Sequence, residues 1–232
     1  MNKPGQKPNN FISTKWLPEL AYAVGLITSD GSLSKDGRHI DFTSKEKGLV
    51  RLFKKCLNLS NKIGKKTSGS SGLNNYFRIQ FGSVQFYKWL LKIGLTSNKS
   101  KTLGSLKIPN KYFFDFLRGV FDGDGCIYSF WDKRWRSSFM FYIKFVSASP
   151  KFLKWLQKKI TKLVGIKGFI NKVSQRVLGL NFAKKDSIII FHMMYHSDNI
   201  PFHHRKFTKA QKIFKINREN NAQVMEQVYI HG

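Results

Sequence analysis

Two segments of this chain repeat one pattern, in which an apolar run with a central glycine ends in Asp-Gly. The first, residues 23–31, reads AVGLITSDG, and the second, residues 117–125, reads LRGVFDGDG. The apolar runs predict two equivalent helices, the first over about 18–30, each followed by a glycine suited to a left-handed cap. A duplicated helix constrains the fold strongly, because it predicts two similar halves around a pseudo-twofold axis.

The repeat extends beyond these helices. Residues 41–53 align with residues 144–156, so that Ser44 corresponds to Ser147. The offset there is 103, against 94 for the motif aspartates, which predicts a longer connection in the second half between residues 125 and 143. We therefore expect two halves, 11–108 and 109–218, and tails at 1–10 and 219–232.

Each half reads as helix, two strands, helix, two strands and helix, which is an α+β arrangement. Alternating or continuous apolar residues predict strands at 39–43, 76–81 and 139–146. Apolar residues at helical spacing predict amphipathic helices around 49–57, 86–93, 152–163 and 187–195. We expect a hairpin tip at 68–72, where serine and glycine dominate, and a turn within 172–177.

The charge of the chain favours nucleic acid as its partner. There are 41 Lys and Arg against 13 Asp and Glu, a net charge of +28, and residues 1–110 and 111–232 each contribute +14. Such a chain neutralises phosphates well, although an anionic membrane surface is the rival partner. No apolar run has the roughly 20 residues of a membrane span, and the first ten residues are not a secretory signal. Two cysteines in all indicate a reducing compartment, either a bacterial or archaeal cytoplasm or an organelle.

Small residues repeat at a spacing of four on both motif helices: Gly25 and Ser29 on the first, Gly119 and Gly123 on the second. Residues four apart share a helix face, so these positions predict close packing of one motif helix against the other. Such packing would make Asp30 and Asp124 neighbours at the two C-terminal ends. An Asp-Gly pair alone commonly marks only a turn, but its occurrence after both matched helices favours a functional role.

Two carboxylates at helix C-termini are electrostatically unfavourable. Each faces the negative end of a helix dipole, at a cost of about 0.3–1 kcal/mol, and the two repel one another. A divalent cation would reverse both effects, and Mg²⁺ commonly combines one or two carboxylates with water and phosphate oxygens. Asp30 and Asp124 are therefore candidate metal ligands for chemistry on a polyanion.

These motifs resemble those of the LAGLIDADG homing endonucleases, in the single-chain form with two motif copies. The second copy, 116–125, is the closer match; the first departs at Thr28, where the family often has an acid. The resemblance covers about residues 18–217. It implies two αββαββα halves packed through the motif helices, with curved antiparallel sheets forming a DNA-binding saddle.

The resemblance also implies an activity, which is metal-dependent cleavage of both DNA strands with short 3′ overhangs. Asp30 and Asp124 would bind Mg²⁺, Mn²⁺ could substitute for it, and Ca²⁺ could bind without supporting cleavage. Lys99 and Lys206 match lysines near the family's active site, with phosphate contact or solvated charge as the alternative. Ser44 and Ser147 stand where many members have a water-organising glutamine.

Base readout would come from polar side chains on the strands and the long hairpin. The candidate DNA contacts are Arg38, Arg78, Gln80, Arg134, Arg136, Lys144, Arg176 and Asn181. We expect a monomer, intron-encoded or free-standing, acting on a double-stranded target site. The alternatives are an RNA maturase that assists splicing of intron RNA and a DNA-binding regulator without cleavage.

Two other patterns are weaker. His192 and His196 have the spacing of zinc-binding histidines on a helix, but no third ligand is evident, so a plain helix face is favoured. Trp131 and Trp135 stand beside basic residues and could stack on bases, although a long hairpin contacting phosphates is the simpler interpretation.

Overall fold

The computed structural model describes residues 12–67, 76–135 and 138–231, with side chains described up to residue 221. The expected hairpin tip at 68–72, the candidate contact Arg136 and the N-terminal tail at 1–10 lie outside these ranges. Among the described residues, no helix is both long enough and apolar enough to cross a membrane.

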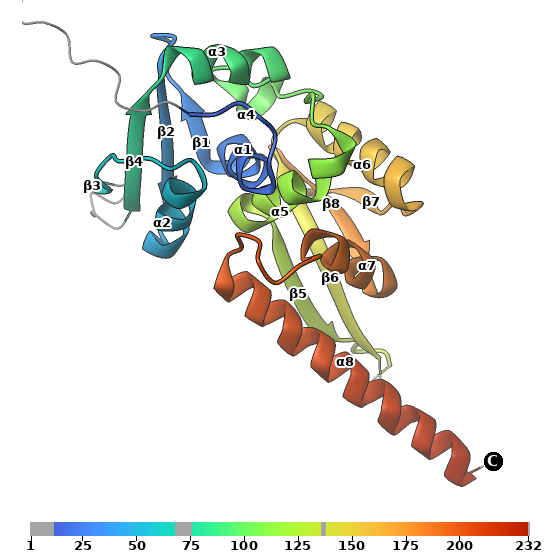
Figure 1. Ribbon diagram of the computed structural model, residues 1–232. Coiled ribbons are helices and arrows are strands. Elements are labelled where there is room, and N and C mark those ends of the chain that lie inside the picture. The colour runs from blue at the N-terminus through green and yellow to red at the C-terminus, as the bar shows by residue number, and fades with distance from the viewer. Residues whose placement is uncertain (1–11, 68–75, 136–137, 232) are drawn as a thin grey trace, which may run out of the picture.

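The two halves of the chain contain the same series of elements (Figure 1). The first series is α1 (Pro18–Asp30), β1 (Gly31–Leu33), β2 (His39–Ser44), α2 (Lys47–Cys56), β3 (Gly64–Lys66), β4 (Tyr76–Gly82) and α3 (Val84–Ile93). The second is α5 (Phe113–Asp124), β5 (Cys126–Trp131), β6 (Phe139–Ser147), α6 (Pro150–Val164), β7 (Phe169–Ser174), β8 (Val177–Ala183) and α7 (Lys184–Met194). The expected αββαββα repeat is confirmed, and β5 and β6 are the longer second-half hairpin that the offset predicted.

Three further helices connect or extend the halves. Helix α4 (Lys99–Thr102) and the 3-10 helix η1 (Asn110–Tyr112) lie between α3 and α5, on either side of the expected division at 108/109. Helix α8 (His204–His231) follows α7 and projects from the body of the molecule (Figure 1). Residues 219–231, expected to be a tail, are helical because α8 continues through them.

Each half forms one antiparallel four-stranded sheet, and the two sheets have equivalent strand orders, β1-β2-β4-β3 and β5-β6-β8-β7. Their registers also correspond, since Ser44 pairs with Phe77 on β4 and Ser147 pairs with Leu178 on β8. Helices pack on one face of each sheet, α2 and α3 in the first half and α6 and α7 in the second. We call the opposite side of each sheet its outward face.

The motif helices α1 and α5 pack against each other between the two sheets (Figure 1). Nine consecutive residues of α1, from Leu20 to Thr28, are buried, because neighbours surround this helix on all sides. A Cβ on Gly25 would lie 2.2 Å from the Phe116 carbonyl oxygen, and one on Gly119 would lie 2.1 Å from the Tyr22 oxygen. The backbones therefore approach so closely that even an alanine would not fit at either position.

The glycines after the motif helices are not left-handed caps, contrary to the sequence-based expectation. Gly31 has φ −82° and ψ 161°, and Gly125 has φ −77° and ψ 163°, both in the extended region that any residue adopts. Each is crowded instead: a Cβ at Gly31 would lie 2.6 Å from the Ile27 Cα, and one at Gly125 would lie 2.7 Å from the Phe121 Cα. Glycine is required here by space, because the chain folds back tightly from helix into strand.

Candidate active site between the motif helices

Asp30 and Asp124 are the last residues of α1 and α5, and the packing of these helices brings them together. A Cβ on Gly123 would lie 1.9 Å from the Ser29 Oγ and 2.8 Å from an Asp30 carboxylate oxygen. The first-half carboxylate thus lies against the backbone next to Asp124. The four residues expected at the helix interface, Gly25, Ser29, Gly119 and Gly123, all lie where α1 and α5 meet.

Lys99 and Lys206 are neither solvated nor placed on an open phosphate-binding surface. Both are buried, with exposed fractions of 7% and 8%. The Lys206 Nζ donates to the carbonyl oxygens of Phe121, Gly123 and Gly125, at 2.7, 2.8 and 2.7 Å. The Lys99 Nζ donates to the Gly31 oxygen at 2.5 Å, the position equivalent to Gly125. Each lysine therefore places a positive charge at the negative end of a motif helix.

The four charged groups perturb one another. Desolvation, with Asp124 adding to it and the two lysines opposing it, raises the pKa of Asp30 to about 7. Desolvation also raises the pKa of Asp124, again against Lys206 and Lys99. Burial lowers the pKa of Lys99 to about 8 although both aspartates oppose this, and burial likewise lowers the pKa of Lys206. The carboxylates are thus held close together without full charge compensation, which is what a cation-binding pair requires.

Asp122 is a buried acid beside the candidate site that the sequence patterns did not single out. Its carboxylate is buried and accepts hydrogen bonds from the Tyr22 hydroxyl at 2.8 Å, the Tyr195 hydroxyl at 3.1 Å and the His203 N–H at 2.7 Å. Burial raises the pKa of Asp122, and the His203 N–H, the Tyr22 hydroxyl and the charge of Lys206 oppose the rise. Asp122 thereby ties α5 to α1 and to the segment that carries Lys206. Acids are rare in this chain, and one inside an otherwise apolar helix was the sequence signal that could have identified Asp122.

A second contact crosses between the halves at Glu46, which precedes α2. Its carboxylate accepts from the His203 Nε2 at 2.5 Å and from the Arg205 guanidinium at 2.6 and 3.0 Å. Partial burial opposes ionisation, but these hydrogen bonds hold the pKa of Glu46 below its ordinary value. Sequence alone did not reveal this pair, since 157 residues separate Glu46 from His203.

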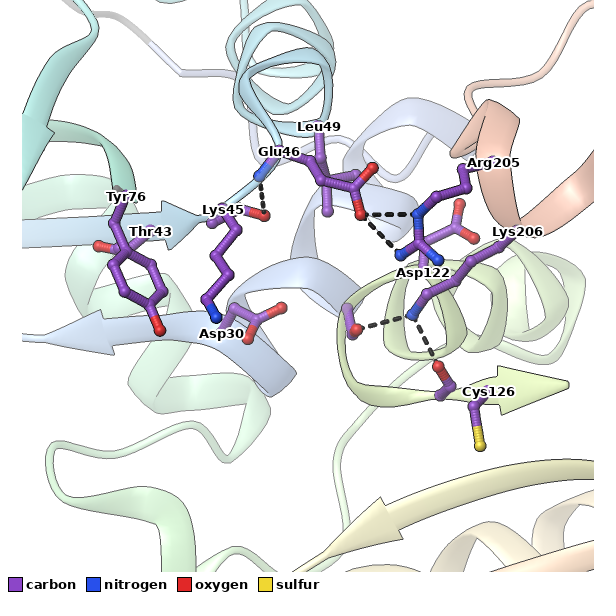
Figure 2. Close-up of a pocket in the computed structure, with 13 residues that line it drawn as sticks. Asp30, Thr43, Lys45, Glu46, Leu49, Tyr76, Asp122, Cys126, Arg205 and Lys206 are labelled. Carbon is purple, nitrogen blue, oxygen red and sulfur yellow. Dashed lines mark hydrogen bonds and ion pairs between the residues drawn. The ribbon is translucent and has the colours of Figure 1, made fainter. Parts of the chain in front are cut away.

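A pocket of about 370 Å³ opens beside these groups (Figure 2). Asp30 lies beside Lys45, with Thr43 and Tyr76 beyond it, and the Glu46–Arg205 pair and Lys206 lie on the other side of Asp30 (Figure 2). Ser44 also lines it, and its Oγ accepts from the Glu46 N–H at 3.2 Å. Ser147 makes the equivalent bond with the Ser149 N–H at 3.1 Å, so both hydroxyl hydrogens remain available to a water or a substrate oxygen.

The candidate DNA contacts have different environments. Arg38, Gln80, Arg134 and Arg176 are exposed, and the Arg134 guanidinium pairs with Asp132 at 3.0 Å. Arg78 pairs through Nε with Asp41 on the outward face of the first sheet. Lys144 lies over the Tyr128 ring, 4.7 Å from its centroid.

Asn181 is the exception, because it is only 1% exposed. Its amide donates to the Phe169 and Gly179 carbonyl oxygens and to the Asn171 side chain. Asn181 holds β7 against β8 and does not present its amide to a ligand.

The weaker patterns fall outside the site. The His196 Nε2 lies 3.1 Å from the Asp115 carboxylate, and the described residues contain no group of three His, Cys, Asp or Glu arranged for a metal. Trp131 and Trp135 are exposed near the turn of the β5–β6 hairpin.

The two carboxylates suit a hard divalent cation whose remaining coordination positions are filled by ligands from outside the protein. Asp30 and Asp124 supply two carboxylates from two helix ends, and no third His, Cys, Asp or Glu among the described residues joins them. Mg²⁺ is typically held this way, by one or two carboxylates with waters and substrate phosphate oxygens. Neighbouring lysines keep the local charge from becoming too negative in the absence of the ion.

Comparison with family models and with curated proteins gives no match. Solved structures do match. One is the LAGLIDADG meganuclease I-AabMI bound to uncleaved DNA, with 15% identity, coverage of 90% of this chain and 92% of that one, and a TM-score of 0.61. Another is I-DmoI in complex with DNA and Ca, with 17% identity, coverage of 84% and 97%, and a TM-score of 0.54; a structure of I-DmoI with DNA and Mn also matches, at a TM-score of 0.50.

A third match is the N-terminal LAGLIDADG domain of DUF199/WhiA, with 15% identity, coverage of 84% of this chain and 89% of that one, and a TM-score of 0.52. At such identities the similarity concerns the fold. Two pseudo-symmetric halves, two antiparallel sheets and paired motif helices together give this chain the LAGLIDADG fold.

Proposed function

We propose that this chain is a site-specific double-strand DNA endonuclease that hydrolyses one phosphodiester on each strand and leaves short 3′ overhangs. The observation that carries the proposal is the pair of carboxylates at the ends of the two packed motif helices, each helix capped by a buried lysine. Because both carboxylates come from one chain, the proposed active form is a monomer. The structural neighbours with DNA and with Ca or Mn support a DNA substrate and a divalent cation.

The proposed roles follow from position. Asp30 and Asp124 would hold Mg²⁺, with Mn²⁺ as a substitute and Ca²⁺ binding without cleavage. Such an ion, when bound, polarises a phosphoryl oxygen and lowers the pKa of its water. Ser44 and Ser147 would orient water through their free hydroxyl hydrogens. Lys206 keeps the end of α5 in place through three carbonyl bonds, whereas Lys99 makes one such bond and keeps donors for water or phosphate.

The test uses a supercoiled plasmid that carries the host intron-insertion sequence, or a site selected from random inserts. We expect linear product with Mg²⁺, none with a chelator, and ends that map to staggered cuts. Asp124→Asn should bind the same site with similar affinity while cleavage falls steeply; Asp198→Asn, at an exposed aspartate, should retain activity. Affinity should also fall sharply with added salt, because phosphate contacts release counterions.

One observation supports a second candidate function. The matched DUF199/WhiA domain has this fold and is described as a LAGLIDADG domain rather than as an endonuclease. A regulator or an intron RNA maturase could therefore share the scaffold. If the plasmid stays intact with Mg²⁺ while an intron transcript splices faster, the maturase is the correct function; if the chain only binds DNA, the regulator is.

A further inference from the structure

The outward faces of the two sheets differ in chemistry although their backbones correspond. On the first sheet, the outward row across β1, β2 and β4 is Ser32, Asp41 and Gln80, and the next pairs Thr43 with Arg78. The Asp41 carboxylate accepts from both Thr43 and Arg78. This face is polar and organised by hydrogen bonds.

On the second sheet, the row equivalent to Ser32, Asp41 and Gln80 is Cys126, Lys144 and Asn181. Aromatic rings begin in the next row, where Tyr128 and Tyr142 correspond to Ser34 and His39 of the first half. Tyr128 pairs with Tyr142, and Phe130 pairs with Met140. Tyr142 stacks on Tyr128 at 5.5 Å and on Phe130 at 6.2 Å, and it meets Phe169 edge-on at 6.3 Å. We call Tyr128, Phe130, Tyr142 and Phe169 the aromatic face.

These rings are available to a ligand. Phe130 and Phe169 are 45% and 47% exposed, and Tyr128 and Tyr142 are half-buried. The described helices of this half pack on the opposite side of the sheet, where Phe141, Ile143 and Phe145 are buried. The rings are therefore not part of the core.

The setting of the aromatic face matches a polyanion. Strands β5 to β8 contain no Asp or Glu, and Lys144 lies within the face over the Tyr128 ring. A Cβ on Gly179 would lie 3.2 Å from the Lys144 Cδ, so the glycine leaves room for the lysine stem. Strand β5 begins two residues after Asp124, so a duplex on the face would continue into the candidate active site.

In the major groove, the feature that an apolar side chain can recognise is the C5 methyl group of thymine. We propose that the aromatic face reads a thymine-rich half-site of duplex DNA through these methyl groups, while the first sheet reads its half-site through hydrogen bonds. The inference rests on the proposed function, since it assigns the substrate sequence class of the same site. Phe130, Tyr142 and Phe169 are the residues that determine specificity in this half.

Binding, not cleavage, is the measurement that tests this. Duplexes are selected from a random library with chelator present, and deoxyuridine then replaces thymine in one half-site at a time. We expect a thymine-rich half-site whose affinity falls about fourfold per methyl removed, the ratio that corresponds to roughly 0.8 kcal/mol per buried methyl-sized group. Deoxyuridine in the other half-site should change affinity by less than about twofold.

Phe130→Ser and Phe169→Ser should each reduce the thymine-over-deoxyuridine ratio in that half-site toward one. Leu91→Ser, which makes the same kind of change at an exposed position of α3, should leave the ratio unchanged. Thermal unfolding of each variant checks that the fold is intact, and the two phenylalanines on separate strands provide independent tests.

The outcomes separate the two hypotheses. Tight binding with equal affinity for thymine and deoxyuridine in both half-sites overturns the aromatic-face proposal and leaves the endonuclease proposal standing. Binding with thymine discrimination but no cleavage under Mg²⁺ supports the aromatic face and contradicts the endonuclease. Preference for unpaired oligonucleotides over duplex overturns both, because the rings would then stack on exposed bases.

Discussion

Replacing Asp30 by asparagine is expected to stabilise the metal-free protein at pH 8. Desolvation, with Asp124 adding to it, raises the pKa of Asp30 to about 7 from an ordinary value of 3.8. Between about pH 4 and pH 7 the unfolded chain therefore releases a proton that the folded chain keeps, so this group lowers stability as pH rises. At about 1.4 kcal/mol per pKa unit, the loss is at most about 4 kcal/mol at pH 8 and about 1.5 kcal/mol at pH 5.

Urea unfolding with chelator present measures this effect. The stability of Asp30→Asn relative to wild type should increase by about 2–3 kcal/mol between pH 5 and pH 8. Comparing the two proteins at each pH removes the contribution of titrating groups that do not interact with Asp30. Asp198→Asn, at an exposed loop aspartate, should show no such increase.

Adding a divalent cation should reverse the order of stabilities. Millimolar Ca²⁺ at pH 8 should stabilise wild type, because the ion binds the folded state only. It should not stabilise Asp30→Asn to the same extent, since one carboxylate ligand is missing. An advantage of Asp30→Asn that is equal at pH 5 and pH 8, or equal gains from Ca²⁺ in both proteins, would refute the electrostatic reasoning.

Two further predictions concern stability. Gly25→Ala should destabilise the fold by more than about 3 kcal/mol in urea titrations, since its Cβ would lie 2.2 Å from a carbonyl oxygen of α5; Gly48→Ala, on α2 with open space around it, should stabilise by up to about 1 kcal/mol. Lys206→Met should cost about 2 kcal/mol and Lys99→Met about 1 kcal/mol, because Lys206→Met leaves the Gly123 and Gly125 oxygens without their lysine donor, whereas the Phe121 oxygen keeps the Gly125 N–H and Lys99→Met affects the Gly31 oxygen alone. Equal losses of stability in the two variants would contradict the inference that Lys206 caps its motif helix more strongly than Lys99 does.

The repeat, the strand positions and the packing of the motif helices could be predicted because they depend on local periodicity. Alternation at 76–81 and 39–43 identified β4 and β2 within a residue of their ends. Small residues spaced by four on both motif helices indicated the close approach, since only a missing side chain permits such contact. These signals are contained within single segments and need no knowledge of distant neighbours.

The environment of the lysines could not be predicted, because it depends on contacts between distant segments. Position matched Lys206 to the site, but whether its ammonium lies in solvent or on the end of α5 depends on how α8 approaches α5. The left-handed caps were wrong for a related reason: glycine satisfies both positive φ and lack of space, and the sequence does not distinguish them. The alternation of residues along β8 correctly placed Asn181 on the outward face, but its bonds to β7 bury the side chain.

The two motif copies also differ at one position, where the second has an acid and the first has a threonine. Asp122 and Thr28 occupy equivalent positions, four residues after Arg118 and Val24 respectively. The Thr28 hydroxyl donates to the Val24 oxygen at 2.7 Å and needs no partner from elsewhere. Asp122 instead accepts from Tyr22, Tyr195 and the His203 N–H, and so fixes the segment leading to Lys206. The first half reaches its lysine through α4, which contains only Lys99–Thr102, and has no comparable segment to anchor. In this chain, therefore, the acid at this position stands in the half where a long return segment has to be fixed, and the proposal of two metal ligands depends on Asp30 and Asp124, the aspartates that both motif copies share.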